Sequence, residues 1–280
     1  MTTRRNLVVV RAGDNSVHPG WVSGPQRNFD LYVSYFGNQP DRYADHAEYH
    51  ENRKGMKWPV LGELLQAHPD LIDRYDYVWL PDDDLVADTD TLNRMFDLAA
   101  AFRLALAQPA LTRNSYYTWP LLLQDPRYVL RYTRFIEVMA PLFDREALRT
   151  CLPSFTESNS GWGLDFVWPR LLEARGPRAL AILDATPVWH SRPVGGGELY
   201  KRTGMNAAQD DMQRLFARYG LDRSAQMEAR YVSGGVREVG LPPWRRLLDA
   251  ITRPLRRANA RRLERRAQRK RQQTASLHET

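Results

Sequence analysis

Short apolar runs alternate with longer amphipathic stretches through the first half of the chain. Residues 7–10 (LVVV), 29–36 (FDLYVSYF) and 77–80 (YVWL) are rich in apolar, β-branched and aromatic side chains, which is typical of buried strands. Apolar residues at helical spacing follow Pro59, and they recur between residues 92 and 106. This alternation predicts an α/β fold with a mixed, mostly parallel sheet flanked by helices.

The second half of the chain shows weaker periodicity. Residues 179–183 and 186–189 have the composition of two further short strands, whereas residues 108–160 are less regular and contain clustered aromatic residues. We expect one folded domain over residues 1–240 and a separate tail over residues 241–280.

Three consecutive aspartates, Asp82, Asp83 and Asp84, follow the apolar run 77–80. Adjacent carboxylates repel one another unless a cation or water takes up their charge. In an extended segment side chains alternate between faces, so Asp82 and Asp84 share one face and Asp83 points away. Two carboxylates at the carboxyl end of a buried strand suit Mg²⁺ or Mn²⁺. The alternative interpretation is an acidic turn before a helix capped near Asp88.

A second stretch with the residues for chemistry is Gly161–Trp162–Gly163–Leu164–Asp165. Its two glycines permit unusual backbone dihedrals and close approach of another segment. Trp162 offers an apolar face to a sugar ring, and Asp165 is able to accept a proton from a hydroxyl group. The alternative is a glycine-rich turn in which Asp165 caps the following helix.

Four further positions are candidates for ligand contacts. His190 closes an apolar strand, as the aspartates do, and a neutral imidazole suits a metal site built from carboxylates. Lys57 stands at a predicted helix start, where phosphate binds favourably. Arg11 and Asp30, near two strand ends, are weaker candidates for nucleotide contacts. Each of the four has a simpler interpretation as a structural or solvated side chain.

Composition narrows the class of protein. The 280 residues are 43% hydrophobic, which supports a substantial core, and Cys151 is the single cysteine, so an intrachain disulfide is impossible. The apolar run near the N-terminus is too short for a signal peptide, and no window reaches the roughly 18 apolar residues of a membrane span. We therefore expect a cytoplasmic protein.

The net charge of +7 is concentrated at one end of the chain. Residues 245–271 hold 12 Lys or Arg and two acids, Asp249 and Glu264, a net +10 that leaves −3 for all other residues. Apolar residues from Trp244 onward follow helical spacing until Pro254. Such a segment, over residues 244–271, suits the surface of an anionic membrane. A solvated basic tail is the alternative, and nucleic-acid binding is disfavoured because few aromatic residues are interleaved.

Taken together, these stretches resemble domain-of-unknown-function family 707 (DUF707). The segments found in the same order are RAGDNSVHPGW, FDLYVSYFG, KWP, YDYVWLPDDDL, QPALT, RFIEVMAPLF, GWGLDFVW and VWH, over roughly residues 5–200. That family looks like GT-A glycosyltransferases, whose DxD motif is similar to the acidic motif of this chain.

The resemblance implies a role for individual residues. Asp82 and Asp84 match the outer acids of DxD and would hold the Mn²⁺ or Mg²⁺ that bridges the diphosphate of a nucleotide-sugar, with Asp83 beside them. His190 resembles a further metal ligand. Asp165 resembles the acceptor-activating base of inverting members, and Trp162 and Trp189 would wall the donor or acceptor site.

The chain is thus expected to be a metal-dependent glycosyltransferase that acts on a glycan or lipid-linked acceptor, in the cytoplasm or at the inner face of a membrane. Two alternatives stay open. Residues 82–86 also fit the acid motif of haloacid-dehalogenase-like phosphatases, with Asp82 as the nucleophile and Asp84 as the general acid. The third possibility is a non-catalytic protein that binds a nucleotide or a glycan.

Overall fold

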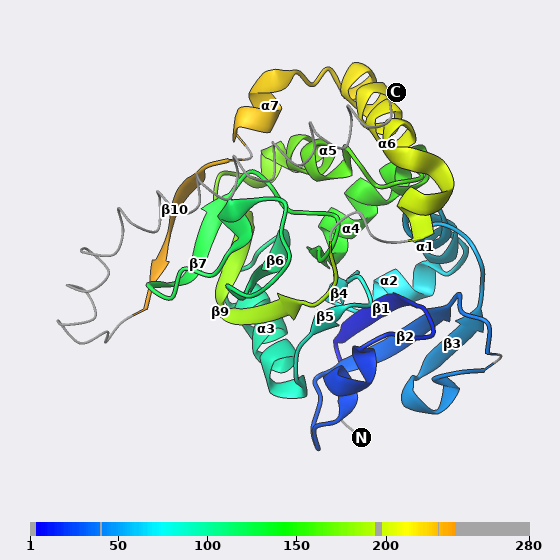
Figure 1. Cartoon of the computed structure of the whole chain (residues 1–280). Coiled ribbons are helices and arrows are strands. Elements are labelled where there is room, and N and C mark those ends of the chain that lie inside the picture. Colours follow the sequence, from blue (N-terminus) through cyan, green and yellow to red (C-terminus); the bar gives the residue numbers. More distant parts are fainter. Residues whose placement is uncertain (1–3, 40, 194–197, 229, 239–280) are drawn as a thin grey trace. The chain divides into compact units, whose positions relative to one another are not determined.

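A ten-stranded β-sheet forms the centre of the part of the chain that the structure describes (Figure 1). The computed structural model describes residues 4–39, 41–193, 198–228 and 230–238. The strands lie in the order β10-β7-β9-β6-β8-β4-β1-β2-β3, and β5 pairs with β9. Their bounds are β1 Asn6–Ala12, β2 Phe29–Tyr35, β3 Tyr49–Asn52, β4 Tyr77–Trp79, β5 Leu85–Val86, β6 Leu106–Leu111, β7 Tyr128–Thr133, β8 Leu142–Asp144, β9 Leu180–His190 and β10 Val232–Arg237.

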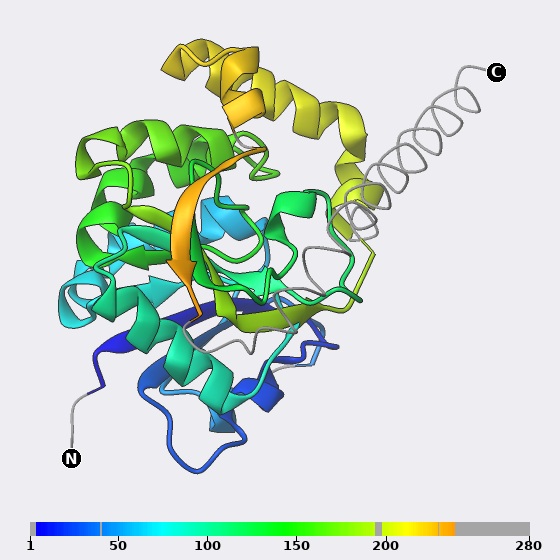
Figure 2. The same cartoon turned by 90° about the vertical axis from the view of Figure 1, so that its left-hand side faces the viewer.

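The sheet is mixed, as predicted. Strands β3, β2, β1 and β4 are mutually parallel, and β6 is parallel to β9. Strand β8 runs antiparallel to both β4 and β6, and thereby joins the two parallel parts. Strand β10 pairs antiparallel with β7 and forms an outer edge of the sheet (orange in Figure 2). The carboxyl ends of β1, β2 and β4 therefore meet at one edge, where ligands of open α/β sheets bind.

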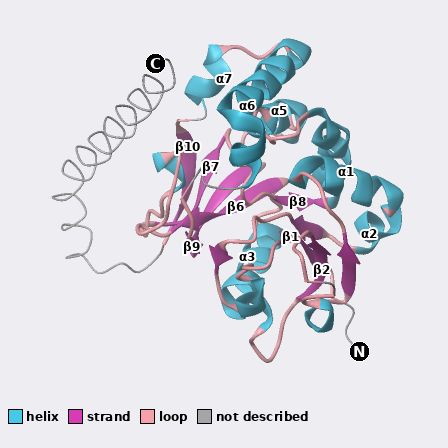
Figure 3. Cartoon of the chain, turned by 45° about the vertical axis from the view of Figure 1, so that its right-hand side comes forward, coloured by secondary structure: helices cyan, strands magenta, loops and turns pink. Residues whose placement is uncertain are grey.

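Helices cover both faces of the sheet (Figure 3). They are α1 Lys57–Ala67, α2 Pro69–Arg74, α3 Thr89–Ala101, α4 Arg145–Cys151, α5 Leu164–Leu171, α6 Glu198–Tyr219 and α7 Arg223–Glu228. Short 3₁₀ helices occur at His18–Val22, Ala44–His46, Pro120–Leu122, Leu152–Glu157 and Glu173–Arg175.

Two hydrophobic cores explain why β1 is a continuous apolar run. Successive side chains of a strand point to opposite faces. Val8 and Val10 enter the core that α3 covers, and Leu7 and Val9 enter the core built with α1, α4 and α5. All four residues are fully buried. A strand covered on both faces has no solvent-facing positions, so its sequence does not alternate.

The predicted helix near residues 92–106 differs from the observed one. Asp88 caps α3 by accepting a hydrogen bond from Thr91 N at 2.8 Å, but the helix ends at Ala101. Arg103 then adopts a positive φ of 52°. This left-handed residue turns the chain into β6, so the prediction was wrong for the last residues because Leu104 and Leu106 belong to the turn and the next strand.

The two strands predicted at residues 179–183 and 186–189 are a single strand, β9, which begins at Leu180. Pro187 is accommodated where the pairing of β9 with β6 shifts register. The irregular stretch 108–160 contains part of β6 together with β7, β8 and α4. Residues up to Arg237 form one contact unit, and the second begins at Glu238. The predicted amphipathic tail over residues 244–271 lies outside the described residues.

No helix among the described residues has the length and apolar character needed to cross a membrane.

Candidate functional site

The three aspartates lie between β4 and β5, at the carboxyl end of the parallel strands. Asp82 N donates to Met139 O at 2.7 Å, which ties the motif to the segment before β8. The expected extended segment is instead a turn at Asp83 and Asp84. Asp83 nevertheless points away from its neighbours: its Oδ2 accepts from Gly13 N at 2.8 Å, and its Oδ1 pairs with Arg192 at 3.1 Å. It therefore links the loops that follow β1 and β9.

Asp82 is paired with Lys57, the first residue of α1. Lys57 Nζ donates to Asp82 Oδ1 at 2.6 Å, to Val138 O at 3.0 Å and to Met139 O at 3.4 Å. Burial by the surrounding protein raises the pKa of Asp82. The charge of Lys57 opposes that shift, and the charge of Asp84 adds to it. Solvent still reaches Asp82, because 43% of its side chain is exposed.

Asp84 faces His190, so the structure brings together two of the candidate residues. His190 Nδ1 lies 2.7 Å from Tyr116 O, and since a carbonyl only accepts, this nitrogen carries the hydrogen. In the neutral imidazole the lone pair of Nε2 is then directed at Asp84 Oδ2, 3.3 Å away. Asp84 Oδ1 is buried and has no hydrogen-bond partner within the described residues.

Asp84 and His190 supply donor atoms of the kind that would hold a cation. A carboxylate and an imidazole lone pair that face each other repel unless the imidazole is protonated or a cation lies between them. Burial lowers the pKa of His190, but the hydrogen bond and charge of Asp84 outweigh it, so the net direction is upward. Oxygen and imidazole donors suit Mn²⁺ and Mg²⁺. No group of three His, Cys, Asp or Glu side chains within the described ranges is arranged to hold a metal; Asp82 is turned to Lys57.

The glycine-rich loop before α5 has the dihedrals that the sequence predicted. Gly161 and Gly163 have φ of 81° and 97°. A Cβ on Gly161 would lie 2.3 Å from Trp58 Cδ1, and one on Gly163 would lie 2.9 Å from Leu215 Cδ1. The loop is therefore pressed between α1 and α6.

Helix α6 fixes this loop through one buried acid. Asp211 Oδ2 accepts hydrogen bonds from Ser160 N at 2.8 Å and from Ser160 Oγ at 2.7 Å, and Asp211 is 4% exposed. Its partner on α6 is Arg214. Sequence reasoning did not identify Asp211, because the pattern around it is that of an ordinary amphipathic helix.

Asp165 lies in the first turn of α5 and is 8% exposed. Its Oδ1 is buried without a hydrogen-bond partner in the described part of the chain. Burial, and then the charge of Glu137, raise the pKa of Asp165 to about 8. The side chain is therefore mostly protonated at neutral pH.

Glu137 is a second residue of this site that sequence reasoning missed. Burial raises its pKa to about 7; Asp82 adds to the shift, and His190 and Lys57 oppose it. The charge of Glu137 is therefore coupled both to the aspartate site and to Asp165. The only signal in the sequence was an acid inside the apolar run RFIEVMAPLF.

The remaining predicted residues are distributed around the molecule. Trp162 is partly buried next to Asp165, and Trp189 on β9 is 39% exposed beside Val86 of β5. Arg11 is 4% exposed; its guanidinium donates to Ser34 Oγ at 2.7 Å and to Gly55 O at 3.0 Å, and burial lowers its pKa to about 10.

The structure does not bring Asp30 to the site. It stands near the amino end of β2, level with Leu7 and Val78, where its carboxylate pairs with Arg4 at 2.9 Å and accepts from Tyr75 Oη at 2.6 Å. The aspartates lie at the opposite ends of these strands. Parallel pairing thus separates Asp30 from Asp82 although both are close to strand ends in the sequence.

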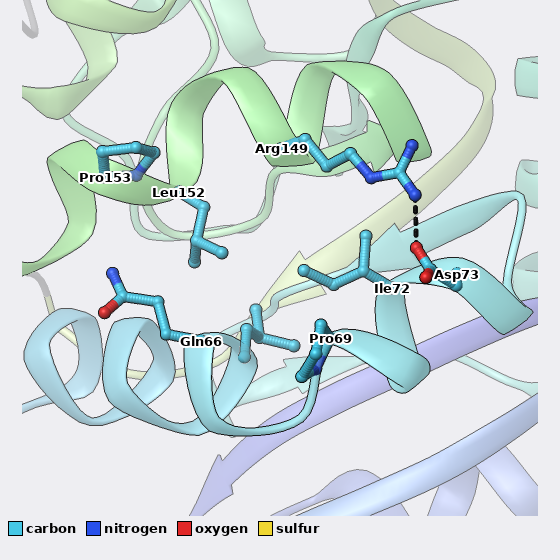
Figure 4. Close-up of a pocket in the computed structure, with 8 residues that line it drawn as sticks. Gln66, Pro69, Ile72, Asp73, Arg149, Leu152 and Pro153 are labelled. Atoms are coloured by element: carbon cyan, nitrogen blue, oxygen red, sulfur yellow. Dashed lines mark hydrogen bonds and ion pairs between the residues drawn. The ribbon is translucent and has the colours of Figure 1, made fainter.

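A pocket of about 380 Å³ lies away from the aspartates, between α1, α2 and α4 (Figure 4). Ile72, Leu152 and Pro153 line it, and the Asp73–Arg149 ion pair closes one side. Helix α2 precedes β4, so this pocket is near the amino end of β4. It contains neither the unpartnered polar atoms nor the charged pairs of the aspartate site.

Comparison with known proteins agrees with the predicted resemblance. The sequence model of the family "Protein of unknown function (DUF707)" matches residues 42–131. No curated protein matches the sequence. Among solved structures, the fold is similar to that of GalNAc-T7, crystallised with UDP, GalNAc and Mn²⁺, with a TM-score of 0.53 at 10% identity. The match covers 77% of this chain, which spans about half (49%) of that protein's length. At this identity the match shows the fold, which is GT-A-like.

Proposed function

We propose that this protein is a metal-dependent glycosyltransferase that moves a sugar from a nucleotide-sugar to a hydroxyl group. The observation that carries this proposal is the Asp84–His190 pair at the carboxyl ends of the strands of a GT-A-like fold. The carboxylate has one buried oxygen without a partner, and the imidazole nitrogen opposite it is 3.3 Å from the other oxygen. Such a donor set suits a cation, which would take the place of the proton that otherwise bridges the carboxylate and the imidazole.

In this proposal Asp84 and His190 would hold Mn²⁺ or Mg²⁺, and Asp82 would join them with the oxygen that Lys57 does not bind. When bound, the metal offsets the charge that builds on the departing nucleoside diphosphate. Lys57 keeps Asp82 in place, because its ammonium group already has three acceptors. A contact of Lys57 with phosphate, which the sequence predicts, requires that one of these acceptors be released.

Asp83 and Arg192 form the wall of the donor site next to the loop after β1. Asp83 Oδ2 holds Gly13 N, so the backbone of this loop is fixed at the position where a nucleotide reaches the strand ends. Arg11, near the carboxyl end of β1, donates to Ser34 of β2 and to Gly55 before α1, and so ties these neighbouring segments to β1. We therefore propose that Arg11 shapes the nucleotide site and that Asp30 makes no contact with the nucleotide.

The acceptor side is formed by the loop before α5. Trp162 and Trp189 offer apolar faces to sugar rings, and the carboxyl pair Asp165 and Glu137 is the group that receives the proton of the acceptor hydroxyl. Direct displacement with a protein base gives inversion at the anomeric carbon. The acceptor class that suits the basic tail is a glycan or lipid-linked glycan at an anionic membrane surface, with the protein at its cytoplasmic face.

A thermal-shift panel tests the proposal. UDP, GDP and their common sugar conjugates are added to the full chain with and without Mn²⁺, and Asp84→Asn is measured beside the wild type. We expect at least one nucleotide to raise the melting temperature only with Mn²⁺, and the shift to disappear in Asp84→Asn. The absence of any shift in the wild type would argue against a nucleotide-sugar enzyme.

A further inference from the structure

Glu137 lies between the metal side and the acceptor side of the site. The segment that carries it runs along the aspartates, because Met139 O accepts from Asp82 N at 2.7 Å and Val138 O accepts from Lys57 Nζ at 3.0 Å. The same segment packs on α5: the rings of Phe135 and Phe166 are 5.4 Å apart. Glu137 is therefore placed where a donor held by Asp84 would meet an acceptor near Asp165.

The backbone of Glu137 is fixed on both sides. Its N–H donates to Gln108 Oε1 at 2.6 Å, and its carbonyl accepts from Ala140 N at 3.2 Å. Gln108 is fully buried on β6. A side chain on such a rigid backbone keeps its reach and direction, as a proton acceptor in catalysis requires.

The two acids differ in access to solvent. The Asp165 side chain is almost fully buried, and one of its oxygens is closed off from water. Glu137 is partly exposed. Glu137 is therefore the more accessible of the two acids to an incoming hydroxyl group, and Asp165 is mostly protonated at neutral pH.

Building on the proposed transferase function, we infer that Glu137 is a catalytic residue and that its carboxylate receives the proton of the acceptor hydroxyl. The O–H bond of the acceptor breaks and its proton passes to Glu137. The oxygen forms a bond to the anomeric carbon, and the bond from that carbon to the diphosphate breaks with its electron pair on the leaving group. Asp165 is a positioning residue that stays neutral behind Glu137.

Donor hydrolysis, with water as the acceptor, tests this assignment without knowledge of the natural acceptor. The probes are UDP-GalNAc, UDP-glucose and GDP-mannose with Mn²⁺, and released UDP or GDP is measured. Glu137→Gln keeps the shape of the side chain and removes the base, so we expect a rate at least about 100-fold lower. Asp165→Asn resembles a protonated carboxyl group, so its rate falls less than about 10-fold.

Three controls show whether a lower rate in Glu137→Gln reflects loss of the base. Binding of UDP or GDP with Mn²⁺, measured by calorimetry, stays within about threefold of wild type in Glu137→Gln, because a base adds to the rate and not to nucleotide affinity. Glu146→Gln, an exposed glutamate paired with Arg149 on α4, is the matched control and keeps the wild-type rate. Glu137→Asp retains a carboxylate, and its rate lies between those of Glu137→Gln and wild type even if the glutamine variant folds poorly.

The outcomes separate the two proposals. Wild-type turnover that survives in Glu137→Gln, or that is lost in Asp165→Asn alone, overturns the role of Glu137 and leaves the transferase function standing. A wild-type protein that binds no nucleotide, or that binds but releases no UDP or GDP, overturns the enzymatic function and the base together.

Discussion

Each carboxyl group at the site differs in what surrounds it. Asp82 has an ammonium group, Asp83 a backbone N–H and a guanidinium group, and Asp84 an imidazole. Asp165 is nearly fully buried, and the described part of the chain gives it no charged partner of opposite sign. In the proposed site these differences divide the acids into those that would hold a cation or the backbone and those that would exchange protons, because burial without compensation favours the neutral form.

The stability of the protein should depend on the protonation of Asp165. Burial raises its pKa from 3.8 to about 8 in the folded chain, so between these values the folded state binds a proton that the unfolded state has released. Its contribution to stability is full below pH 4 and is lost as the pH rises through about 8. We expect Asp165→Asn to melt with a weaker pH dependence than wild type between pH 5 and about 8.

Differential scanning fluorimetry at a series of pH values measures this effect. Asp90→Asn, which removes an exposed acid from the first turn of α3, is the control and should keep the wild-type pH dependence. Equal pH dependence in wild type and Asp165→Asn would show that Asp165 is ionised in the folded protein at neutral pH.

At the scale of elements, the site depends on the loop held between α1, α5 and α6. Gly161 packs on Trp58 of α1, Gly163 packs on Leu215 of α6, and Asp211 of α6 binds Ser160. The loop is therefore set by contacts with residues about 100 and 50 positions away in the chain. Any change that moves the loop also moves Asp165 and Trp162.

Substitution of Gly161 measures how tightly the loop is held. Gly161→Ala adds the strain of a positive φ of 81° and places a Cβ 2.3 Å from Trp58, whereas Gly176→Ala adds similar strain at a φ of 90° with no atom within 4 Å. We expect Gly176→Ala to cost about 1 kcal/mol and Gly161→Ala about 2–3 kcal/mol more, by urea denaturation. Equal losses would show that the loop moves freely to accept the methyl group.

The elements that the sequence predicted well are those buried on both faces. β1 and β4 contain consecutive apolar residues, and β2 is buried throughout although it includes Asp30 and Ser34, because both sides of the sheet are covered there. The sequence was less informative for β6 to β8, since β6 contains Pro109 and β8 has only three residues, so neither shows a period. These strands are held by pairing with their neighbours in the sheet, and the local sequence pattern does not reveal that pairing.

The candidate site was predictable only in part, for a related reason. Asp82, Asp84, His190 and Asp165 stood out because each breaks an apolar or glycine-rich pattern at a strand or helix end. Glu137 and Asp211 do not, because their roles arise from neighbours that are distant in sequence. The exclusion of Asp30 also required the register of β1 with β2, which no sequence pattern gives.

At the scale of the whole molecule, charge is divided between two parts of the chain. Residues 245–271 carry a net +10, and the rest of the sequence carries −3. This division separates the main part of the chain, whose own bulk charge attracts no polyanion, from a segment suited to an anionic surface. The membrane contact and the transferase site are thus independent parts of the proposal.

Vesicle binding tests the tail. The full chain should sediment with vesicles that contain phosphatidylglycerol but not with phosphatidylcholine vesicles, and 0.5 M salt, a condition with a Debye length of about 4 Å, should release it. Replacing Arg256, Arg257, Arg261 and Arg262 with Gln should weaken binding by roughly 1 kcal/mol per residue while leaving the melting temperature unchanged. Equal binding to neutral vesicles would contradict an electrostatic membrane contact.

The most direct test of the account is the metal dependence of donor turnover. The full chain is incubated with UDP- and GDP-sugars, with Mn²⁺ or with EDTA, and the release of UDP or GDP is compared between wild type and Asp84→Asn. We predict release by the wild type with Mn²⁺, and at least about a 100-fold loss both in EDTA and in Asp84→Asn. Release that is equal with EDTA, equal in Asp84→Asn, or absent for every donor would contradict the account.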